Sequence, residues 1–326
     1  MLDTNRTLKY LNTERHWLKS NKTAIIVHGG AIKGAFAAGV MYQLSRIGIK
    51  TADILVGTSS SVPTMAYFTS QQFDFMRNIW LNEVGTREFV QYVNLLAGKP
   101  VFDLRYLIDV VFRQKYPLDV ARIIKSKSLF LIPLYNYQEG RVEFINNQEE
   151  RMTKNFWKIL QAAITVHDQH IVREDGLEQF VDAYLDPFAF YRQEVIPKDY
   201  NVIIVINYKE LHRTFKRWVG IRIYRLLQSK NFPDGVKDKQ KIRGALIESG
   251  FRLFEIFERE YEPIIISPSP ITKVATITLI TRNKDRLNYL FSVGKQSVVD
   301  MMDNDQRMKE LEIFVSRSKK LSNSKK

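Results

Sequence analysis

The sequence predicts an α/β fold, a three-layer sandwich with a mainly parallel central sheet. Two short apolar runs, residues 24–28 and 53–57, have the length and the β-branched content of buried strands. Each run is followed by small or polar residues and then by a segment with helical spacing, so a strand–turn–helix unit occurs twice between residues 24 and 69. Such units predict parallel strands joined by right-handed crossovers.

The other expected elements continue this alternation. A glycine-containing turn at 138–140 predicts a hairpin between its flanking strands. We expect strands at 128–135, 141–145, 201–206, 263–267 and 275–279, and helices at 33–47, from 63 onward, through most of 71–128, and at 154–166, 209–260 and 283–315.

Composition excludes several classes of protein. Hydrophobic residues make up 45% and charged residues 26% of the 326 residues, which is ordinary for a chain with a packed core. There is no cysteine, so disulfides, thiolate zinc sites and a cysteine nucleophile are excluded. No window approaches the ~18 consecutive apolar residues of a membrane span, and residues 1–20 lack the apolar core of a secretory signal. We therefore expect a cytoplasmic protein.

The formal net charge of +14 would attract polyanions, either nucleic acid or an anionic membrane surface. A basic composition unrelated to function explains the charge equally well. No nucleic-acid-binding motif accompanies it, so no specific nucleic-acid partner is predicted.

A glycine-rich turn, His28-Gly-Gly-Ala-Ile-Lys-Gly34, lies between the first strand and its helix. Backbone N–H groups at a helix start are unpaired, and glycines allow a ligand to approach them closely. Such a loop can hold a phosphate or the oxyanion of a tetrahedral intermediate. It also fits a damaged dinucleotide-binding fingerprint, G-x-A-x-x-G. A tight turn without any ligand is the simpler interpretation.

A serine-rich turn, Gly57-Thr-Ser-Ser-Ser61, follows the second strand. It fits the nucleophile elbow G-x-S-x-G except at the last position, where Ser61 is still small. In such an elbow Ser59 would be the exposed nucleophile. A serine-rich helix N-cap is the alternative. Adjacent parallel strands would bring this turn and the glycine loop to the same edge of the sheet, where such folds place their ligands.

The stretches IIVHGGAIKGAFAAGVMYQLSRIGI and ADILVGTSSSVPTMAYF together resemble the opening of the patatin-like phospholipase family, in particular its bacterial branch. The resemblance implies a glycine-loop oxyanion hole, a serine nucleophile and a later aspartate base, without a histidine. It assigns Ser59 as the nucleophile, with an elbow of Gly57, Thr58, Ser60 and Ser61. The oxyanion loop would consist of Gly29, Gly30, Ala31, Ile32, Lys33 and Gly34, with Lys33 where the family usually has arginine.

The third family motif, D-G-G or D-G-A, is matched by Asp182-Ala183 after an aromatic–aliphatic pair. Asp182 would accept the proton of Ser59 as general base. Asp186 is a weaker substitute, and a turn aspartate that caps local N–H groups is the structural alternative.

Three residues depart from the family pattern: Ala31, Ser61 and Ala183 replace glycines. Residues 162–167 also lack the family's proline. A non-glycine residue at positive φ costs about 1–2 kcal/mol, and a misplaced oxyanion donor costs about 2.7–4 kcal/mol of transition-state stabilisation. A catalytically weakened or silent lipid-binding relative is therefore the alternative to an active hydrolase.

Other arrangements fit less well. A Ser59–Asp182–His212 triad would need several strands before the elbow, whereas only one precedes it. His167 and His170 lack a convincing third metal ligand, so a solvated loop is the expectation there. A Rossmann-type nucleotide-binding protein would carry an acidic residue where the serine turn stands.

Residues 209–230 form a basic segment with interspersed aromatic residues, which could dock on anionic lipid as a helix. The membrane-contact candidates are Lys216, Arg217, Trp218 and Arg222. A packed helix with snorkelling arginines explains the pattern as well.

These observations predict a lead-in at 1–22, a patatin-like catalytic domain at 23–207, an extension of the same fold at 208–315 and a basic, disordered tail at 316–326. The expected activity is hydrolysis of a lipid or other acyl ester by Ser59 and Asp182, with no metal or cofactor. The enzyme would be cytoplasmic and could bind membranes peripherally. The sequence does not specify the oligomeric state.

Overall fold

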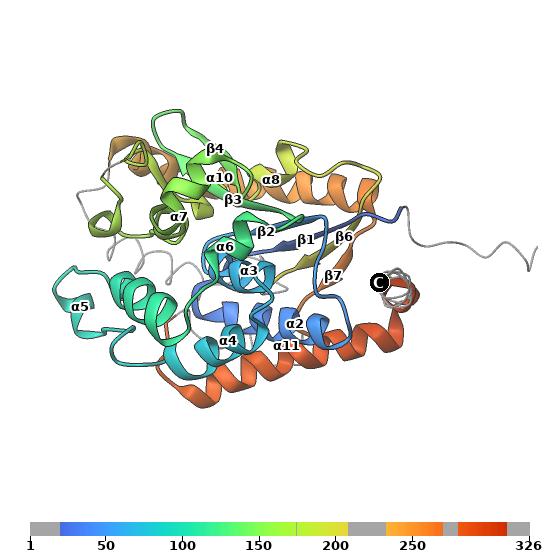
Figure 1. Cartoon of the computed structure of the whole chain (residues 1–326). Coiled ribbons are helices and arrows are strands. Elements are labelled where there is room, and N and C mark those ends of the chain that lie inside the picture. The colour runs from blue at the N-terminus through green and yellow to red at the C-terminus, as the bar shows by residue number, and fades with distance from the viewer. Residues whose placement is uncertain (1–19, 174, 208–232, 270–279, 312–326) are drawn as a thin grey trace, which may run out of the picture.

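A computed structural model describes residues 20–173, 175–207, 233–269 and 280–311, which form an α/β protein with a mostly parallel mixed sheet (Figure 1). The strands are β1 (Thr23–Val27), β2 (Ile54–Gly57), β3 (Leu129–Asn136), β4 (Arg141–Asn146), β5 (Phe180–Asp182), β6 (Asn201–Val205) and β7 (Ile264–Ile266). Their order is β4-β3-β2-β1-β6-β7, with β5 paired to β3. Strands β3, β2, β1, β6 and β7 are parallel to one another, and β4 and β5 are antiparallel to β3.

The helices lie on both faces of this sheet (Figure 1). The α-helices are α2 (Gly34–Arg46), α3 (Ser61–Thr69), α4 (Phe73–Asn78), α5 (Val93–Leu96), α6 (Val120–Ile124), α7 (Glu150–Ala163), α8 (Ala189–Arg192), α10 (Asp234–Tyr261) and α11 (Lys284–Asn304). The 3₁₀ segments are η1 (Ala31–Lys33), η4 (Asp168–His170) and η5 (Ala183–Leu185), and the π-helical segments are η2 (Ile79–Glu83) and η3 (Tyr106–Lys115). None of the helices among the described residues is long and apolar enough to cross a membrane.

Side chains of β1 alternate between two buried clusters, as expected for a strand covered on both faces. Ile25 and Val27 belong to the cluster formed with α2, α3 and α11. Ala24 and Ile26 belong to the cluster formed with α8 and α10. The central sheet is therefore the middle layer between two helical layers.

Helix α11 packs directly on α2 because each helix has a glycine at the crossing. A Cβ atom at Gly39 would lie 2.0 Å from the carbonyl oxygen of Phe291, and one at Gly294 would lie 2.1 Å from that of Phe36. The two backbones thus approach more closely than any side chain would permit. This contact fixes α2, which begins directly after the glycine-rich loop.

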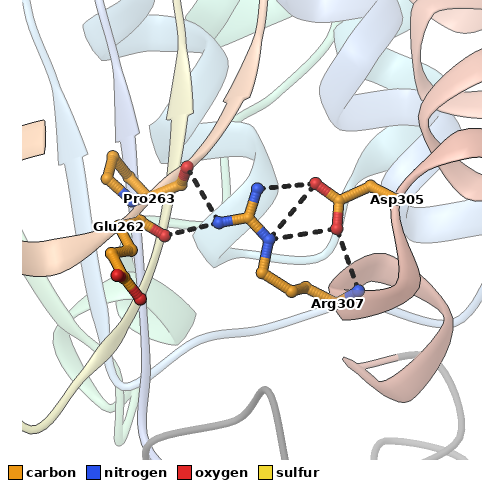
Figure 2. Close-up of polar contacts among 4 residues, drawn as sticks. All are labelled: Glu262, Pro263, Asp305 and Arg307. Carbon is orange, nitrogen blue, oxygen red and sulfur yellow. Dashed lines mark hydrogen bonds and ion pairs between the residues drawn. The ribbon is translucent and has the colours of Figure 1, made fainter.

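The end of the α11 region is joined to the sheet by Arg307 (Figure 2). Its guanidinium donates to the carbonyl of Glu262 at 2.7 Å, just before β7, and forms an ion pair with Asp305 at 2.6 Å. This ion pair lowers the pKa of the Asp305 carboxyl. A single arginine therefore links the residue that ends α10 to the chain after α11.

The predicted strands that became β1, β2, β3, β4, β6 and β7 and the predicted helices that became α2, α3 and α7 are present with shifts of a few residues at their ends. Residues 71–128, predicted to be mostly helical, instead hold five short helical segments separated by turns and loops. The hairpin is confirmed, with Gly140 at φ 68° in the turn between β3 and β4. The short strand β5 was not predicted, because three residues carry no measurable alternation. The expected strand at 275–279, the basic segment 209–230 and the tail 316–326 lie outside or largely outside the described residues.

Candidate active site

Ser59 lies in a sharp turn between β2 and α3, with its backbone in the left-handed region at φ 56°. A non-glycine residue in this region is uncommon and costs free energy, and such residues concentrate at functional sites. The turn is closed by hydrogen bonds from the Ser61 amide to the Thr58 carbonyl and from the Val62 amide to the Ser59 carbonyl. This strand–turn–helix geometry is the one that a nucleophile elbow requires.

Gly57 allows the strand and the helix of the turn to pass close together. A Cβ atom at this position would lie 3.0 Å from the Met65 side chain and from the backbone of Ser61 and Val62. A larger residue at position 57 would therefore collide with the start of α3.

Ser61, which replaces the last glycine of the motif, has a structural role of its own. Its buried hydroxyl lies 2.7 Å from the Val27 carbonyl and 2.8 Å from the Thr58 carbonyl, and it accepts a hydrogen bond from the Thr58 amide at 2.8 Å. The hydroxyl therefore joins the end of β1 to the turn that carries Ser59. Ser61 is not among the described residues at positive φ, so no backbone strain results from the replacement.

The glycine-rich loop lies against Ser59, as the sequence predicts. A Cβ atom at Gly29 would approach the Ser59 Cβ to 2.6 Å, the Thr58 carbonyl oxygen to 2.7 Å and the Ser59 Oγ to 3.4 Å. The backbone at Gly29 is thus in direct contact with the serine turn, and only glycine fits there.

Of the three glycine replacements, only Ala31 has the strained conformation considered above, with φ 49°. Ala183 is buried in η5 and, like Ser61, is absent from the positive-φ residues of the described chain. Two of the three departures therefore carry no left-handed strain.

The amides of the loop are not equally available to an oxyanion, which corrects part of the prediction. The Lys33 amide donates to the Gly30 carbonyl at 3.0 Å, and the Gly34 amide donates back into η1. The Gly30 amide donates to the Ser60 hydroxyl at 3.2 Å. The amides of Ala31 and Ile32 open the 3₁₀ turn, where N–H groups have no acceptor within the turn. Burial lowers the pKa of the half-buried Lys33.

Asn207, which sequence reasoning missed, holds the loop in place. Its side-chain amide donates to the carbonyl of Gly29 at 3.2 Å and also to that of His28, and its Oδ1 accepts from the Ala37 amide at 3.2 Å. The residue is fully buried. The same rule that drew attention to the other strand ends would have found it, because Asn207 follows β6, the neighbour of β1.

Asp182 is the last residue of β5, and the register of the sheet places it beyond the carboxyl end of β2, the strand that precedes the elbow. Strand β4 occupies one edge of β3, so β5 must pair on the other edge, the one that β2 occupies. Val56 pairs with Leu131 and Asp182 pairs with Leu134, three residues further along β3. Ser59 follows the carboxyl end of β2, so both residues lie beyond the stretch in which β2 and β3 pair.

The Asp182 carboxylate is completely buried, and its Oδ1 accepts from the Tyr184 amide at 2.8 Å. Its own amide donates to the Thr165 carbonyl at 3.2 Å, which fixes the end of β5 against the chain after α7. Asp186, the weaker candidate, is instead paired with Arg192 at 2.9 Å and Lys239 at 3.4 Å. Asp186 therefore has a structural environment of its own.

His28 forms a second polar pair beside the loop that the sequence did not suggest. Its Nε2 lies 2.6 Å from the hydroxyl of Tyr191, and the two rings stack with centroids 5.8 Å apart. Burial lowers the pKa of His28 to about 4 and raises that of Tyr191, so the hydrogen bond joins two neutral groups.

The expectation of a solvated loop at residues 167–170 is wrong. His167 is 7% exposed and Asp168 is 3% exposed, and they pair at 2.8 Å. His170 Nε2 lies 3.0 Å from the Phe102 carbonyl, and burial lowers its pKa. In the described part of the chain no three histidine, aspartate or glutamate side chains gather as metal ligands would. His212 and the membrane-contact candidates Lys216, Arg217, Trp218 and Arg222 lie outside the described residues.

Comparison with known proteins gives a similarity over part of the chain. The chain is similar to the uncharacterized protein YjjU of Escherichia coli (strain K12), with 27% identity over 112 residues. These residues are 33% of this chain and 31% of that protein, so the match spans about a third of each. No family model matches the chain.

Proposed function

We propose that this chain is a serine acyl-ester hydrolase of the patatin-like type, acting on a lipid ester. One observation carries the proposal: Ser59, at φ 56° in a strand–turn–helix, is contacted by the glycine loop, and the buried Asp182 ends a strand that pairs with β3 beyond the end of β2. A positioned hydroxyl, a buried carboxylate and nearby backbone amides are the components of acyl transfer.

In the proposed reaction, the Asp182 carboxylate accepts the Ser59 proton as the Ser59 Oγ attacks the ester carbonyl carbon. The amides of Ala31 and Ile32, with that of Ser60 at the start of α3, donate to the resulting oxyanion. Asp182 then returns the proton to the leaving alcohol. Water then attacks the acyl carbon while Asp182 accepts a proton from it, and Asp182 passes this proton to the Ser59 Oγ as the acyl group leaves as a carboxylic acid. These steps require no metal or other cofactor.

The location of Ser59 near the start of α3 adds electrostatic support to this reaction. The first amides of a helix are unpaired, and the helix dipole places a partial positive charge of about half a unit at its N-terminus. Ser59 lies two residues before the first residue of α3, so developing negative charge at the attacked carbonyl would be stabilised there. The silent alternative predicts the same fold without covalent chemistry.

The test is intact mass spectrometry after exposure to a fluorophosphonate probe. We expect one adduct on the wild-type protein and none on Ser59→Ala, whereas Ser297→Ala, a serine on α11, should label as wild type does. Asp182→Asn should slow labelling by at least a hundredfold. A wild-type protein that gains no adduct while remaining folded would identify a silent relative instead.

Dinucleotide binding is the second candidate, because the parallel strands have the order β3-β2-β1-β6-β7 and the glycine loop follows β1, at the point where that order reverses. Asn207 lies against Gly30 at that point, and Ser59 stands where an acidic residue would bind a ribose. We therefore rank it below ester hydrolysis. Titration with NADH, followed by nucleotide fluorescence, distinguishes the two: saturable binding without a fluorophosphonate adduct would favour the nucleotide.

A lipid substrate implies contact with a membrane surface, and the net charge of +14 favours an anionic one. Co-sedimentation of Ser59→Ala with anionic and with neutral liposomes tests this without hydrolysis of the lipid. Equal binding to both kinds of liposome, or to neither, would remove the electrostatic argument.

A further inference from the structure

A hollow of about 580 Å³ lies at the edge of the sheet opposite to the edge that carries Ser59. Thr51 precedes β2 and Ser128 precedes β3, so the hollow lies at the amino ends of these strands, whereas Ser59 follows the carboxyl end of β2. The remainder of its wall comes from the end of α3 and from α6 and the residues after it.

Positive charge dominates this hollow. Its lining includes Arg122, Lys125 and Lys127, against one carboxylate, that of Asp119. The Asp119 Oδ1 accepts from the Arg122 amide at 2.9 Å as the N-cap of α6. In the described part of the chain neither lysine has an ion-pair partner. Two lysines without an ion pair among the described residues therefore line the same space.

The carboxyl end of α3 brings some opposing charge, since helix C-termini carry a partial negative charge of about half a unit. Its last carbonyls are already bonded, however: the amides of Ser70, Gln71 and Gln72 donate to the carbonyls of residues 66, 68 and 67. Three full positive charges outweigh the dipole. The Gln71 side chain also accepts a hydrogen bond from the Arg122 guanidinium at 2.7 Å, and this bond fixes the position of the guanidinium.

The loop that carries both lysines is fixed from beneath by Asn147, which is fully buried. The Asn147 Nδ2 donates to the carbonyls of Ile123 at 2.9 Å and Ser128 at 3.1 Å, and its Oδ1 accepts from the Phe130 amide at 2.8 Å. One side chain thus clamps the backbone on both sides of Lys125 and Lys127. A binding site built on a fixed backbone loses less entropy when a ligand is bound.

The lining of the hollow also includes the hydroxyl groups of Thr51 and Ser128. The Thr51 and Ser128 hydroxyls lie 2.7 Å apart, and Ser128 is only 4% exposed. One hydroxyl donates to the other, so the second hydroxyl does not use its own hydrogen in this bond and can donate it elsewhere. Lysine, arginine and hydroxyl donors around one space are the groups that bind phosphate oxygens.

We propose that this hollow binds the phosphate group of a phosphomonoester. The volume lies within the range of small-molecule sites, about 300–1,000 Å³, so it leaves room for an organic part beside the phosphate. The proposal does not depend on hydrolysis at Ser59. A soluble phosphomonoester and a phosphomonoester lipid headgroup share this chemistry, and the experiment separates them.

Isothermal titration calorimetry with sn-glycerol 3-phosphate measures binding of a soluble phosphomonoester. Co-sedimentation with phosphatidic acid liposomes measures binding of a phosphomonoester lipid headgroup. We expect saturable binding that Lys125→Ala/Lys127→Ala weakens at least tenfold. Lys154→Ala/Lys284→Ala removes the same charge elsewhere and should bind as wild type does. Lys127→Glu, a single exposed change, provides a second variant in case the double variant is unstable.

The outcomes are distinct. Binding of glycerol phosphate in solution assigns a soluble ligand, whereas binding of phosphatidic acid liposomes alone, in preference to phosphatidylglycerol liposomes of equal charge, assigns a lipid headgroup. Equal loss in both double variants would mean general electrostatic attraction, and the absence of binding to either form would overturn the proposal. Because calorimetry on Ser59→Ala should give the same result, failure here leaves the hydrolase proposal untouched.

Discussion

Gly29 and Ser59 lie so close together that a methyl group on Gly29 would come within 2.6 Å of the Ser59 Cβ. Real Cβ atoms do not approach one another this closely, so the loop after β1 and the turn after β2 form one rigid unit. Since the two turns are 30 residues apart in sequence, the contact depends on the pairing of β1 with β2.

Gly29→Ala should therefore force the loop away from Ser59. We expect fluorophosphonate labelling to slow by about 10²–10³-fold, the loss that follows displacement of one oxyanion donor. Gly30→Ala is the matched control, because its Cβ would meet the Asn207 side chain at 3.2 Å and the Lys33 Cβ at 3.4 Å and should cost far less. Equal labelling of both variants would argue against contact between the loop and the reacting group.

Ala31→Gly and Ala183→Gly should differ in their effect on stability. At φ 49° glycine relieves left-handed strain of about 1–2 kcal/mol, which roughly offsets the extra entropy of the unfolded chain. Ala183 has no such strain, so its replacement should destabilise the fold by about 0.5–1 kcal/mol. Urea unfolding midpoints measure both changes, and a larger loss at Ala31 than at Ala183 would contradict this account.

Asn207→Leu should loosen the glycine loop while keeping a side chain of similar size. The change removes the donor to the carbonyls of His28 and Gly29 and leaves the Ala37 amide buried without its acceptor. We expect a loss of stability of about 1–3 kcal/mol for each unsatisfied group. Asn207→Asp keeps the acceptor but turns a second oxygen toward the carbonyls, so it should also be destabilising. Thermal unfolding of the two variants tests this role of Asn207. If the side chain were merely tolerated, neither change would alter the unfolding temperature.

His28 should make the protein less stable in acid. Its pKa in the folded state, about 4, lies below the ordinary value of 6.5, so the unfolded chain binds the proton first as the pH falls. This contribution to stability is complete above pH 6.5 and is lost between pH 6.5 and 4, by at most about 3 kcal/mol.

His28→Gln should flatten the urea midpoint over that pH range, while its polar side chain can still reach the Tyr191 hydroxyl. The buried His170 has a pKa lowered in the same direction, so part of the slope should persist. An unchanged slope in His28→Gln would assign the acid sensitivity to other groups.

The local pattern of residues was sufficient to predict the α/β class, the strands at β1, β2, β3 and β6, and the turn that holds Ser59. These predictions succeed because buried strands and strand-to-helix turns have strong local requirements: apolar runs, small residues and glycines where backbones pass closely. The resemblance to patatin-like phospholipases pointed to Asp182, and the catalytic role of both residues remains a prediction.

Contacts between residues that are far apart in the sequence were decided by the tertiary structure. The strand β5 is too short to show a period, yet its pairing with β3 places Asp182 beyond the carboxyl end of β2. The sequence presents Ala31, Ser61 and Ala183 as equivalent replacements of glycine, whereas the backbone puts only Ala31 at positive φ. Asn207 and the His28–Tyr191 pair depend on contacts across more than 160 residues. The sequence gives the chemical type of each side chain directly, but backbone dihedrals and hydrogen-bond partners depend on how the whole sheet packs.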